Sequence, residues 1–138
     1  HVYEDVKISE EIIDGIDNCS IWNFSLFAFD HVPDAVAYYK YARFVIAMRG
    51  HGQILPIGFS VPSIALCNHP KHRGLMNNLN LDEYAIDVVD KFFVEKLSES
   101  ISRIENNYEE IVKLLIEKNK MMYSSAEDAF VKIKNQIK

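Results

Sequence analysis

The stretch from Phe44 to Gln53 constrains the fold of this chain more than any other. Five apolar residues in a row, Phe44 to Met48, are followed by Arg49 and by a Gly-His-Gly turn over residues 50–52. A short apolar run that ends at glycine is typical of a parallel strand covered on both faces. The two glycines permit a tight turn and close approach of a ligand to the backbone. We therefore expect a buried strand whose carboxyl end carries functional groups.

A short helix is predicted after this turn, over Gln53 to Phe59. Pro56 restricts where it can begin, because proline is tolerated only in the first turn, where its missing N–H costs no hydrogen bond. A strand, a glycine turn and a helix N-terminus form the usual anion-binding seat of open α/β sheets, at the carboxyl ends of the strands. Arg49 and His51 would stand at the mouth of this seat.

The same order of elements repeats further along the chain. Ser63 to Cys67 is predicted as a second buried strand, residues 68–74 as a loop, and about Lys71 to Leu79 as a helix. An edge strand is expected over Leu81 to Asp87. Strands that alternate with helices indicate right-handed crossovers and a parallel sheet. The predicted fold class is therefore α/β, with a Rossmann-like three-layer parallel sheet.

The first forty residues give a less regular pattern. Residues 1–8 are interpreted as a strand that continues from upstream, and Ser9 as the N-cap of a helix that ends near Gly15. A further strand is predicted over Ser20 to Phe29. Pro33 suits the start of the next helix.

The end of the chain is predicted to be helical, because neither glycine nor proline follows Gly74. Apolar residues recur there in alternating steps of four and three, which predicts an apolar seam along a helix. The seam consists of Leu97, Ile101, Ile104, Tyr108, Ile111 and Leu115. We expect a Rossmann-like domain over residues 1–90, and C-terminal helices over 91–138 that pack on it or on a missing N-terminal domain. Homo-oligomerisation through the long C-terminal helix stays open.

Composition limits the possible functions. The 138 residues are 49% hydrophobic and 12% aromatic, which is typical of one folded domain. A net charge of −5 argues against nucleic-acid binding, and no apolar run is long enough to cross a bilayer. Cys19 and Cys67 are isolated thiols, which fits a reducing cytoplasm. Because the chain opens on His1 rather than on methionine, we expect it to be a piece of a longer protein.

Basic residues gather in the loop after the second strand, at His69, Lys71, His72 and Arg73. Such a cluster can be a solvated loop, yet positive charge at a helix N-terminus opposes the helix dipole. An anionic ligand would compensate for it, so His69 and Lys71 are predicted to bind a phosphate or carboxylate. Because the histidines lack a partner at metal-ligand spacing, we predict no metal site, and no cofactor is expected.

Residues 48–53, Met-Arg-Gly-His-Gly-Gln, followed by Leu-Pro-Ile-Gly over residues 55–58, closely resemble the polysaccharide pyruvyl transferase family. The family pattern is a strand, an Arg-x-His turn, a short helix, and a second strand that leads into a basic loop. Each part occurs here between about Tyr41 and Val88. The resemblance implies the C-terminal half of a fold similar to GT-B glycosyltransferases. The active site would lie between two Rossmann-like domains, of which the N-terminal one is missing from this chain.

The resemblance also implies an activity. Family members transfer the enolpyruvyl part of phosphoenolpyruvate to two hydroxyls of a saccharide, leaving a pyruvate ketal. The Arg-x-His histidine corresponds to His51, which would be the general acid, because a histidine that titrates near neutrality can protonate the donor's methylene carbon. Arg49 could form a surface ion pair or grip the donor's carboxylate or phosphate. The predicted substrate-binding residues are Arg49, Gly50, Gly52, His69 and Lys71.

Two other functions remain open. A GT-B-like glycosyltransferase would use a nucleotide-sugar in a similar cleft, although the basic loop has no clear acidic residue for a ribose. A non-catalytic binding module would use the long C-terminal helix as its interaction surface. On the favoured interpretation the chain is part of a cytoplasmic transferase of exopolysaccharide biosynthesis. A lipid-linked acceptor would place it at the inner face of the membrane. We expect the isolated chain to be inactive.

Overall fold

A computed structural model describes residues 2–21 and 32–136 of the chain. It divides into two compact units, His1–Tyr38 and Tyr39–Lys138. The second unit contains the sheet and all of the residues predicted to form the functional site.

The described residues of the first unit form the helices α1 (Val2–Ile13) and α2 (Val32–Ala37). The strand predicted over residues 1–8 is wrong, and Ser9 lies inside α1 instead of capping it. The helix extends this far because no glycine or proline interrupts the chain before Gly15, which has a φ of +81°. The strand predicted over Ser20 to Phe29 falls almost entirely on residues 22–31, which lie outside the described residues.

A parallel sheet of three strands forms the centre of the second unit: β1 (Val45–Ala47), β2 (Ser63–Cys67) and β3 (Ala85–Asp87). The strands lie in the order β1-β2-β3, with Ile46 opposite Ile64 and Leu66 opposite Ile86. The side chains of Ile64 and Ala65 in the middle strand are completely buried, as expected of a strand covered on both faces. The predicted α/β class and the boundaries of the second strand are confirmed.

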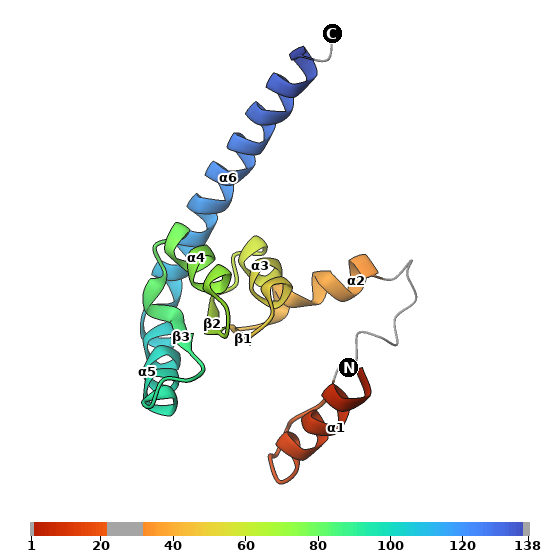
Figure 1. Cartoon of the computed structure of the whole chain (residues 1–138), viewed down its shortest axis with the longest axis vertical. Coiled ribbons are helices and arrows are strands. Elements are labelled where there is room, and N and C mark those ends of the chain that lie inside the picture. Colours follow the sequence, from red (N-terminus) through yellow and green to blue (C-terminus); the bar gives the residue numbers. More distant parts are fainter. Residues whose placement is uncertain (1, 22–31, 137–138) are drawn as a thin grey trace. The chain divides into compact units, whose positions relative to one another are not determined.

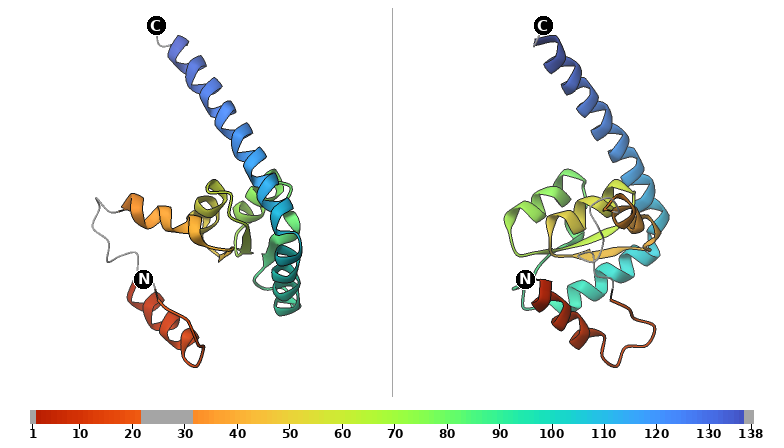
Figure 2. Two further views of the ribbon diagram at one scale, coloured as in Figure 1. Left: turned by 180° about the vertical axis from the view of Figure 1, so that it is seen from behind. Right: turned by 90° about the vertical axis from the view of Figure 1, so that its right-hand side faces the viewer.

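Two helices connect these strands and cover one face of the sheet: α3 (Gly50–Gly58) and α4 (Pro70–Asn78) (Figure 2). Each helix is followed, two residues after its end, by a residue in the left-handed conformation, Ser60 or Asn80, with a φ of +60°. After α3 the N–H of Val61 donates to the carbonyl of Pro56, and after α4 the N–H of Leu81 donates to that of Met76. These are Schellman closures, which satisfy the last carbonyls of a helix and turn the chain back into the sheet. Short 3₁₀ segments, η3 (Tyr38–Tyr41) and η4 (Asp82–Tyr84), precede β1 and β3.

Helix α3 begins earlier than predicted. It starts at Gly50 and not at Gln53, so that Pro56 lies inside it and not in its first turn. Pro56 is fully buried in the core, and its carbonyl accepts the closing hydrogen bond of the helix. Burial of the ring therefore offsets the one backbone hydrogen bond that proline cannot donate.

Helices α5 (Phe93–Asn106) and α6 (Tyr108–Gln136) follow the sheet, and α5 lies on the face opposite α3 and α4. The predicted apolar seam packs into the same core as the strands, with Ile104, Ile111 and Leu115 buried. The Asn119 side-chain amide donates to the carbonyl of Ile57 over 2.8 Å and fixes α6 against the end of α3.

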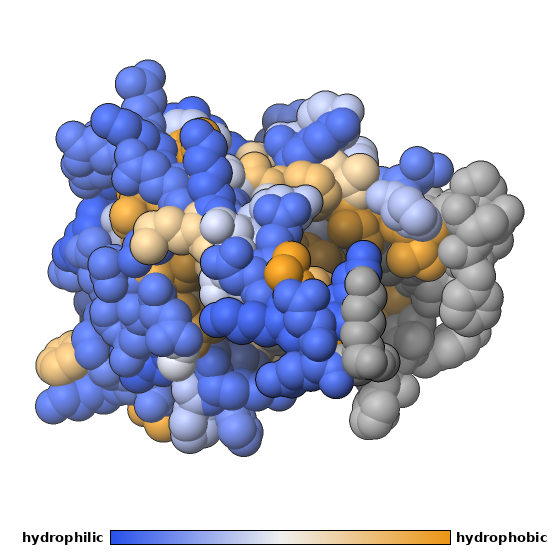
Figure 3. Space-filling view, turned by 90° about the horizontal axis from the view of Figure 1, so that it is seen from above, coloured by the Kyte–Doolittle hydropathy of each residue, from blue (hydrophilic) through white to orange (hydrophobic). Residues whose placement is uncertain are grey.

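Beyond Asn119, α6 extends away from the sheet (Figure 1), and residues 120–136 are all exposed. Seen from above in Figure 3, the surface is largely hydrophilic, with hydrophobic side chains in separate patches. No helix within residues 2–21 and 32–136 is both long and apolar enough to cross a membrane.

Candidate functional site

The predicted site residues lie at the carboxyl edge of β1 and β2, where α3 and α4 begin. Arg49 is the N-cap residue of α3, and His51 is the second residue of that helix. His69 is the N-cap residue of α4, and Lys71 lies in its first turn. All four side chains are exposed. Because β1 and β2 are paired in parallel, the two helix N-termini emerge at one edge of the sheet.

The side chain of His69 caps helix α4 at the end of the basic loop. Its Nδ1 accepts a hydrogen bond of 3.2 Å from the backbone N–H of Lys71, which caps α4. Pro70 occupies the first helical position, where a missing N–H costs nothing. Capping therefore engages Nδ1 of His69 and leaves Nε2 as the ring nitrogen that could contact a ligand.

The first turn of α3, which contains Gly50 and Gly52, packs tightly against the end of β1. A Cβ added at Gly52 would lie 3.0 Å from the Cβ of Ala47, so glycine allows the helix to approach the strand more closely than a larger residue would. Next to it, the buried Gln53 donates from Nε2 to the carbonyl of Ala47 over 3.0 Å. A Cβ added at Gly50 would meet no atom within 4 Å, which leaves the backbone open to a ligand at this position.

His72 does not belong to a solvated loop, as the basic cluster suggested. Its side chain is only 4% exposed, and its Nδ1 has no hydrogen-bond partner among the described residues. Burial lowers the pKa of His72, and the neighbouring charges of Lys71 and His69 lower it further. The sequence contained a signal for this burial: His72, Met76 and Leu79 recur at helical spacing on the apolar face of α4.

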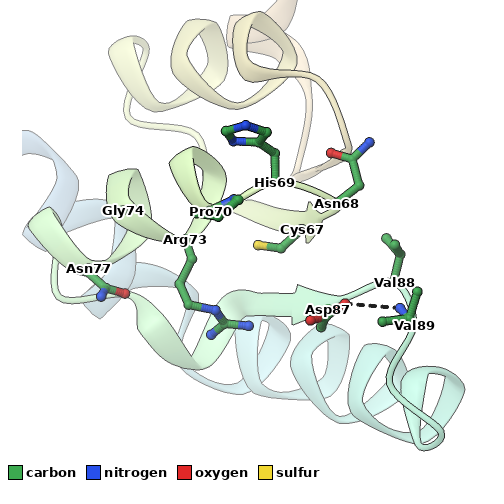
Figure 4. Close-up of a pocket in the computed structure, with 10 residues that line it drawn as sticks. All are labelled: Cys67, Asn68, His69, Pro70, Arg73, Gly74, Asn77, Asp87, Val88 and Val89. Atoms are coloured by element: carbon green, nitrogen blue, oxygen red, sulfur yellow. Dashed lines mark hydrogen bonds between the residues drawn. The ribbon is translucent and has the colours of Figure 1, made fainter.

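A pocket of about 640 Å³ opens beside the basic loop, between α4 and the carboxyl end of β3 (Figure 4). Arg73 extends into it from α4, and Asp87 faces it from the end of β3. The Cys67 thiol lies between them, and burial raises its pKa, with Arg73 offsetting part of the effect. Sequence reasoning missed Asp87, because a single acidic residue at the end of a short strand has no distinctive spacing.

The family model for polysaccharide pyruvyl transferases matches residues 1–70, half of the chain. The chain belongs to the polysaccharide pyruvyl transferase family. The predicted family is thereby confirmed. Neither the curated proteins nor the solved structures gave a match.

The matched segment covers most of the predicted site. Arg49, His51 and His69 lie within residues 1–70, together with the glycine turn. Lys71 lies just beyond the match, as do Arg73 and Asp87 of the pocket.

Proposed function

We propose that this chain carries the donor site of an enzyme that transfers the enolpyruvyl group of phosphoenolpyruvate to a saccharide as a ketal. The observation that carries this proposal is the convergence of two helix N-termini at one sheet edge of a pyruvyl transferase family member. Helix N-termini favour anions through their unpaired N–H groups and their dipoles. Phosphoenolpyruvate carries two anionic groups, a carboxylate and a phosphate, which suits a pair of such ends.

The cations at the two ends suit different parts of the donor. Arg49, with its planar guanidinium, can bind the carboxylate through two parallel hydrogen bonds. Lys71 presents a compact point charge beside the N-terminus of α4, which suits the phosphate. His51 lies two residues from Arg49 at the start of α3, and its side chain is exposed. In the proposed site it would face the donor's methylene carbon.

In this reaction, His51 as imidazolium gives its proton to the methylene carbon, and a methyl group forms. The positive charge that develops at the neighbouring carbon is met by the oxygen of one saccharide hydroxyl, which loses its proton. The oxygen of the second hydroxyl then attacks the same carbon, and the carbon–oxygen bond to phosphate breaks. Of the two hydroxyl protons, one returns to His51 and the other leaves with phosphate. The products are the ketal and inorganic phosphate.

The exposed position of these side chains implies that a second protein surface completes the site. We propose that another domain of the same enzyme covers the sheet edge and supports the saccharide. The exposed end of α6 is a surface on which such a domain, or a second copy of the chain, could pack. The proposed enzyme is cytoplasmic and acts in exopolysaccharide biosynthesis, at the inner face of the membrane where the acceptor is lipid-linked.

One observation favours a second candidate, a glycosyltransferase that uses a nucleotide-sugar. Asp87 stands at the carboxyl end of β3, 20 residues after Cys67 at the carboxyl end of β2. An acidic residue about 20 residues beyond a phosphate-binding turn holds the ribose in dinucleotide-binding folds. The acidic residue that the basic loop lacks is therefore present on the next strand.

Calorimetric titration of the chain with phosphoenolpyruvate, a uridine diphosphate sugar and inorganic phosphate separates these functions. We expect phosphoenolpyruvate to bind more tightly than the other two. Arg49→Ala and Lys71→Ala should each weaken its binding by about 1.5–3 kcal/mol, the range for hydrogen bonds to charged groups. Lys113→Ala removes one positive charge from the exposed surface of α6 and serves as the control. Unchanged affinity in both site variants would mean that the donor is bound elsewhere, and preference for the nucleotide-sugar would favour the second candidate.

A further inference from the structure

The pocket between α4 and β3 is larger than the donor chemistry proposed above requires. Its volume of about 640 Å³ lies within the roughly 300–1,000 Å³ typical of small-molecule sites. The N-terminus of α4 forms part of its wall, but a three-carbon donor held at the two helix ends would leave most of its space unfilled. Its position beside His69, at the same edge of the sheet, makes it adjacent to the donor site.

Charged groups face this pocket without being paired to one another. Arg43 and Arg103 form ion pairs with glutamates, whereas Arg73 forms none with any residue that the structure describes. The Asp87 carboxylate is held in place, because its Oδ1 accepts a hydrogen bond of 3.1 Å from the N–H of Val89. Within the described residues no donor reaches its Oδ2. A fixed carboxylate with one open oxygen is suited to accepting hydrogen bonds from hydroxyl groups.

Gly74 is a second feature of this pocket. It lies in the middle of α4, where glycine costs about 1 kcal/mol relative to alanine. Nothing in the chain requires it, since an added Cβ would meet no atom within 4 Å. The residue lines the pocket, and we expect a large side chain at this position to occupy part of its space. The absence of a side chain keeps the pocket open at a cost in helix stability.

We propose that this pocket is a subsite for a glycosyl phosphate. The sugar hydroxyls would donate to Asp87, the Asn77 amide would add a further polar contact, and the phosphate would face Arg73. The apolar side chains of Val88 and Val89 offer a surface for the C–H face of a sugar ring. Assigning the sugar to the saccharide acceptor, and not to the ribose of a nucleotide, rests on the proposed function.

The test is equilibrium binding to the complete 138-residue chain, measured by calorimetry and by chemical-shift mapping. The probes are glucose 1-phosphate, galactose 1-phosphate, the corresponding methyl glycosides, uridine monophosphate, inorganic phosphate and phosphoenolpyruvate. Gly74→Leu fills the pocket and should weaken binding of the glycosyl phosphates at least tenfold. Gly58→Leu is the matched control, because Gly58 is also helical with open space around its Cβ position and does not line the pocket.

Two further variants test the polar contacts one at a time. They keep the proposal testable even if the Gly74→Leu protein does not fold. Asp87→Asn keeps an oxygen acceptor for the Val89 N–H but removes the charge, and should weaken both the glycosyl phosphates and the methyl glycosides several-fold. Arg73→Gln should weaken the glycosyl phosphates down to the affinity of the methyl glycosides and leave the latter unchanged. The largest chemical-shift changes on binding should occur at Asn77, Asp87 and Val88.

Several results would overturn the proposal. These are no binding of any glycosyl phosphate, equal binding to wild type and to the Gly74→Leu and Asp87→Asn variants, or a Gly74→Leu effect seen with uridine monophosphate alone. Loss of phosphoenolpyruvate binding in Gly74→Leu would make the pocket part of the donor site and would also overturn it. Failure of phosphoenolpyruvate to bind wild type would instead count against the proposed function, while the sugar probes would still decide the role of the pocket.

Discussion

At the scale of single residues, His51 is the group on which the proposed chemistry depends most. It is exposed at the start of α3. In the complete enzyme, His51→Ala should reduce turnover by about 10²–10⁴-fold, the usual contribution of a positioned general acid. Circular dichroism and thermal unfolding should match wild type, because an exposed side chain makes little contribution to the core.

The control is Asn78→Ala, another exposed helical position, which should keep full turnover. A well-folded His51→Ala enzyme that still forms the ketal at a normal rate would exclude His51 as the acid. The proton would then have to come from the acceptor side of the site.

His72 should make the stability of the chain depend on pH. Its pKa in the folded chain is lowered from the ordinary value of 6.5 by burial, so that protonation is disfavoured in the folded state relative to the unfolded state. The stabilisation is therefore complete above pH 6.5 and is lost as the pH falls below it, because the unfolded chain then binds the proton more readily.

Urea unfolding at several pH values between 5 and 8 measures this effect. His72→Gln should flatten the fall of the unfolding free energy below pH 6.5, whereas His51→Gln at an exposed position should leave the slope of wild type. An identical slope in wild type and His72→Gln would show that other groups cause the acid destabilisation.

At the scale of elements, the ends of each strand and helix show what sequence could predict. The boundaries of β2 were predicted correctly, because its buried run is delimited by Pro62 and Asn68. The start of α3 was not, because the proline rule applies to local hydrogen bonding and cannot take into account that Pro56 is buried in the core. The strand predicted over residues 1–8 rested on Val2, Val6 and Ile8, although the four-residue step from Val2 to Val6 also fits the helix that forms.

In the candidate site, too, the sequence could predict the positions of some residues and not of others. Arg49 and His51 were placed correctly at the end of β1, because the motif itself contains the strand, the turn and the helix start. Asp87 was not recognised, because its position opposite Arg73 depends on the pairing of β3 with β2, which joins residues distant in the sequence. His72 was grouped with its charged neighbours, although its burial follows from the helical period.

Replacement of Gly52 in α3 and of Gly74 in α4 by alanine should change the free energy of unfolding in opposite directions. Gly52→Ala places a Cβ 3.0 Å from that of Ala47, which is fixed to the backbone of β1 and cannot rotate away. We expect it to lower the free energy of unfolding by about 1 kcal/mol, as overpacking does. Gly74→Ala meets no atom within 4 Å and should raise it by about 0.5–1 kcal/mol through helix propensity.

Denaturant unfolding of the two variants under identical conditions compares these effects directly. Equal stabilisation by both alanines would mean that α3 can shift away from β1, and that Gly52 is not needed for packing. It would also reopen the possibility that Gly52 serves close approach of a ligand.

At the scale of the whole molecule, folding and activity should separate. The core of the second unit is continuous, since strands, connecting helices and the α5–α6 seam contribute to one buried cluster. We therefore expect the isolated chain to unfold cooperatively in denaturant. The proposed donor residues are nevertheless exposed. The α4–β3 pocket lies beside them, but no described element covers them from the opposite side.

The isolated chain should accordingly bind phosphoenolpyruvate but show no sustained transfer. Orientation of two reactants can contribute on the order of 7 kcal/mol to lowering a barrier, and closure of a site excludes water. Losing such a contribution lowers the rate by about 10⁵-fold, since each 1.4 kcal/mol is a factor of ten. The measurement is phosphate release from phosphoenolpyruvate in the presence of glycosyl phosphates and oligosaccharides, with His51→Ala as the background. Release above that background over many turnovers would mean that the acceptor site is complete within these 138 residues, and that no second domain is needed.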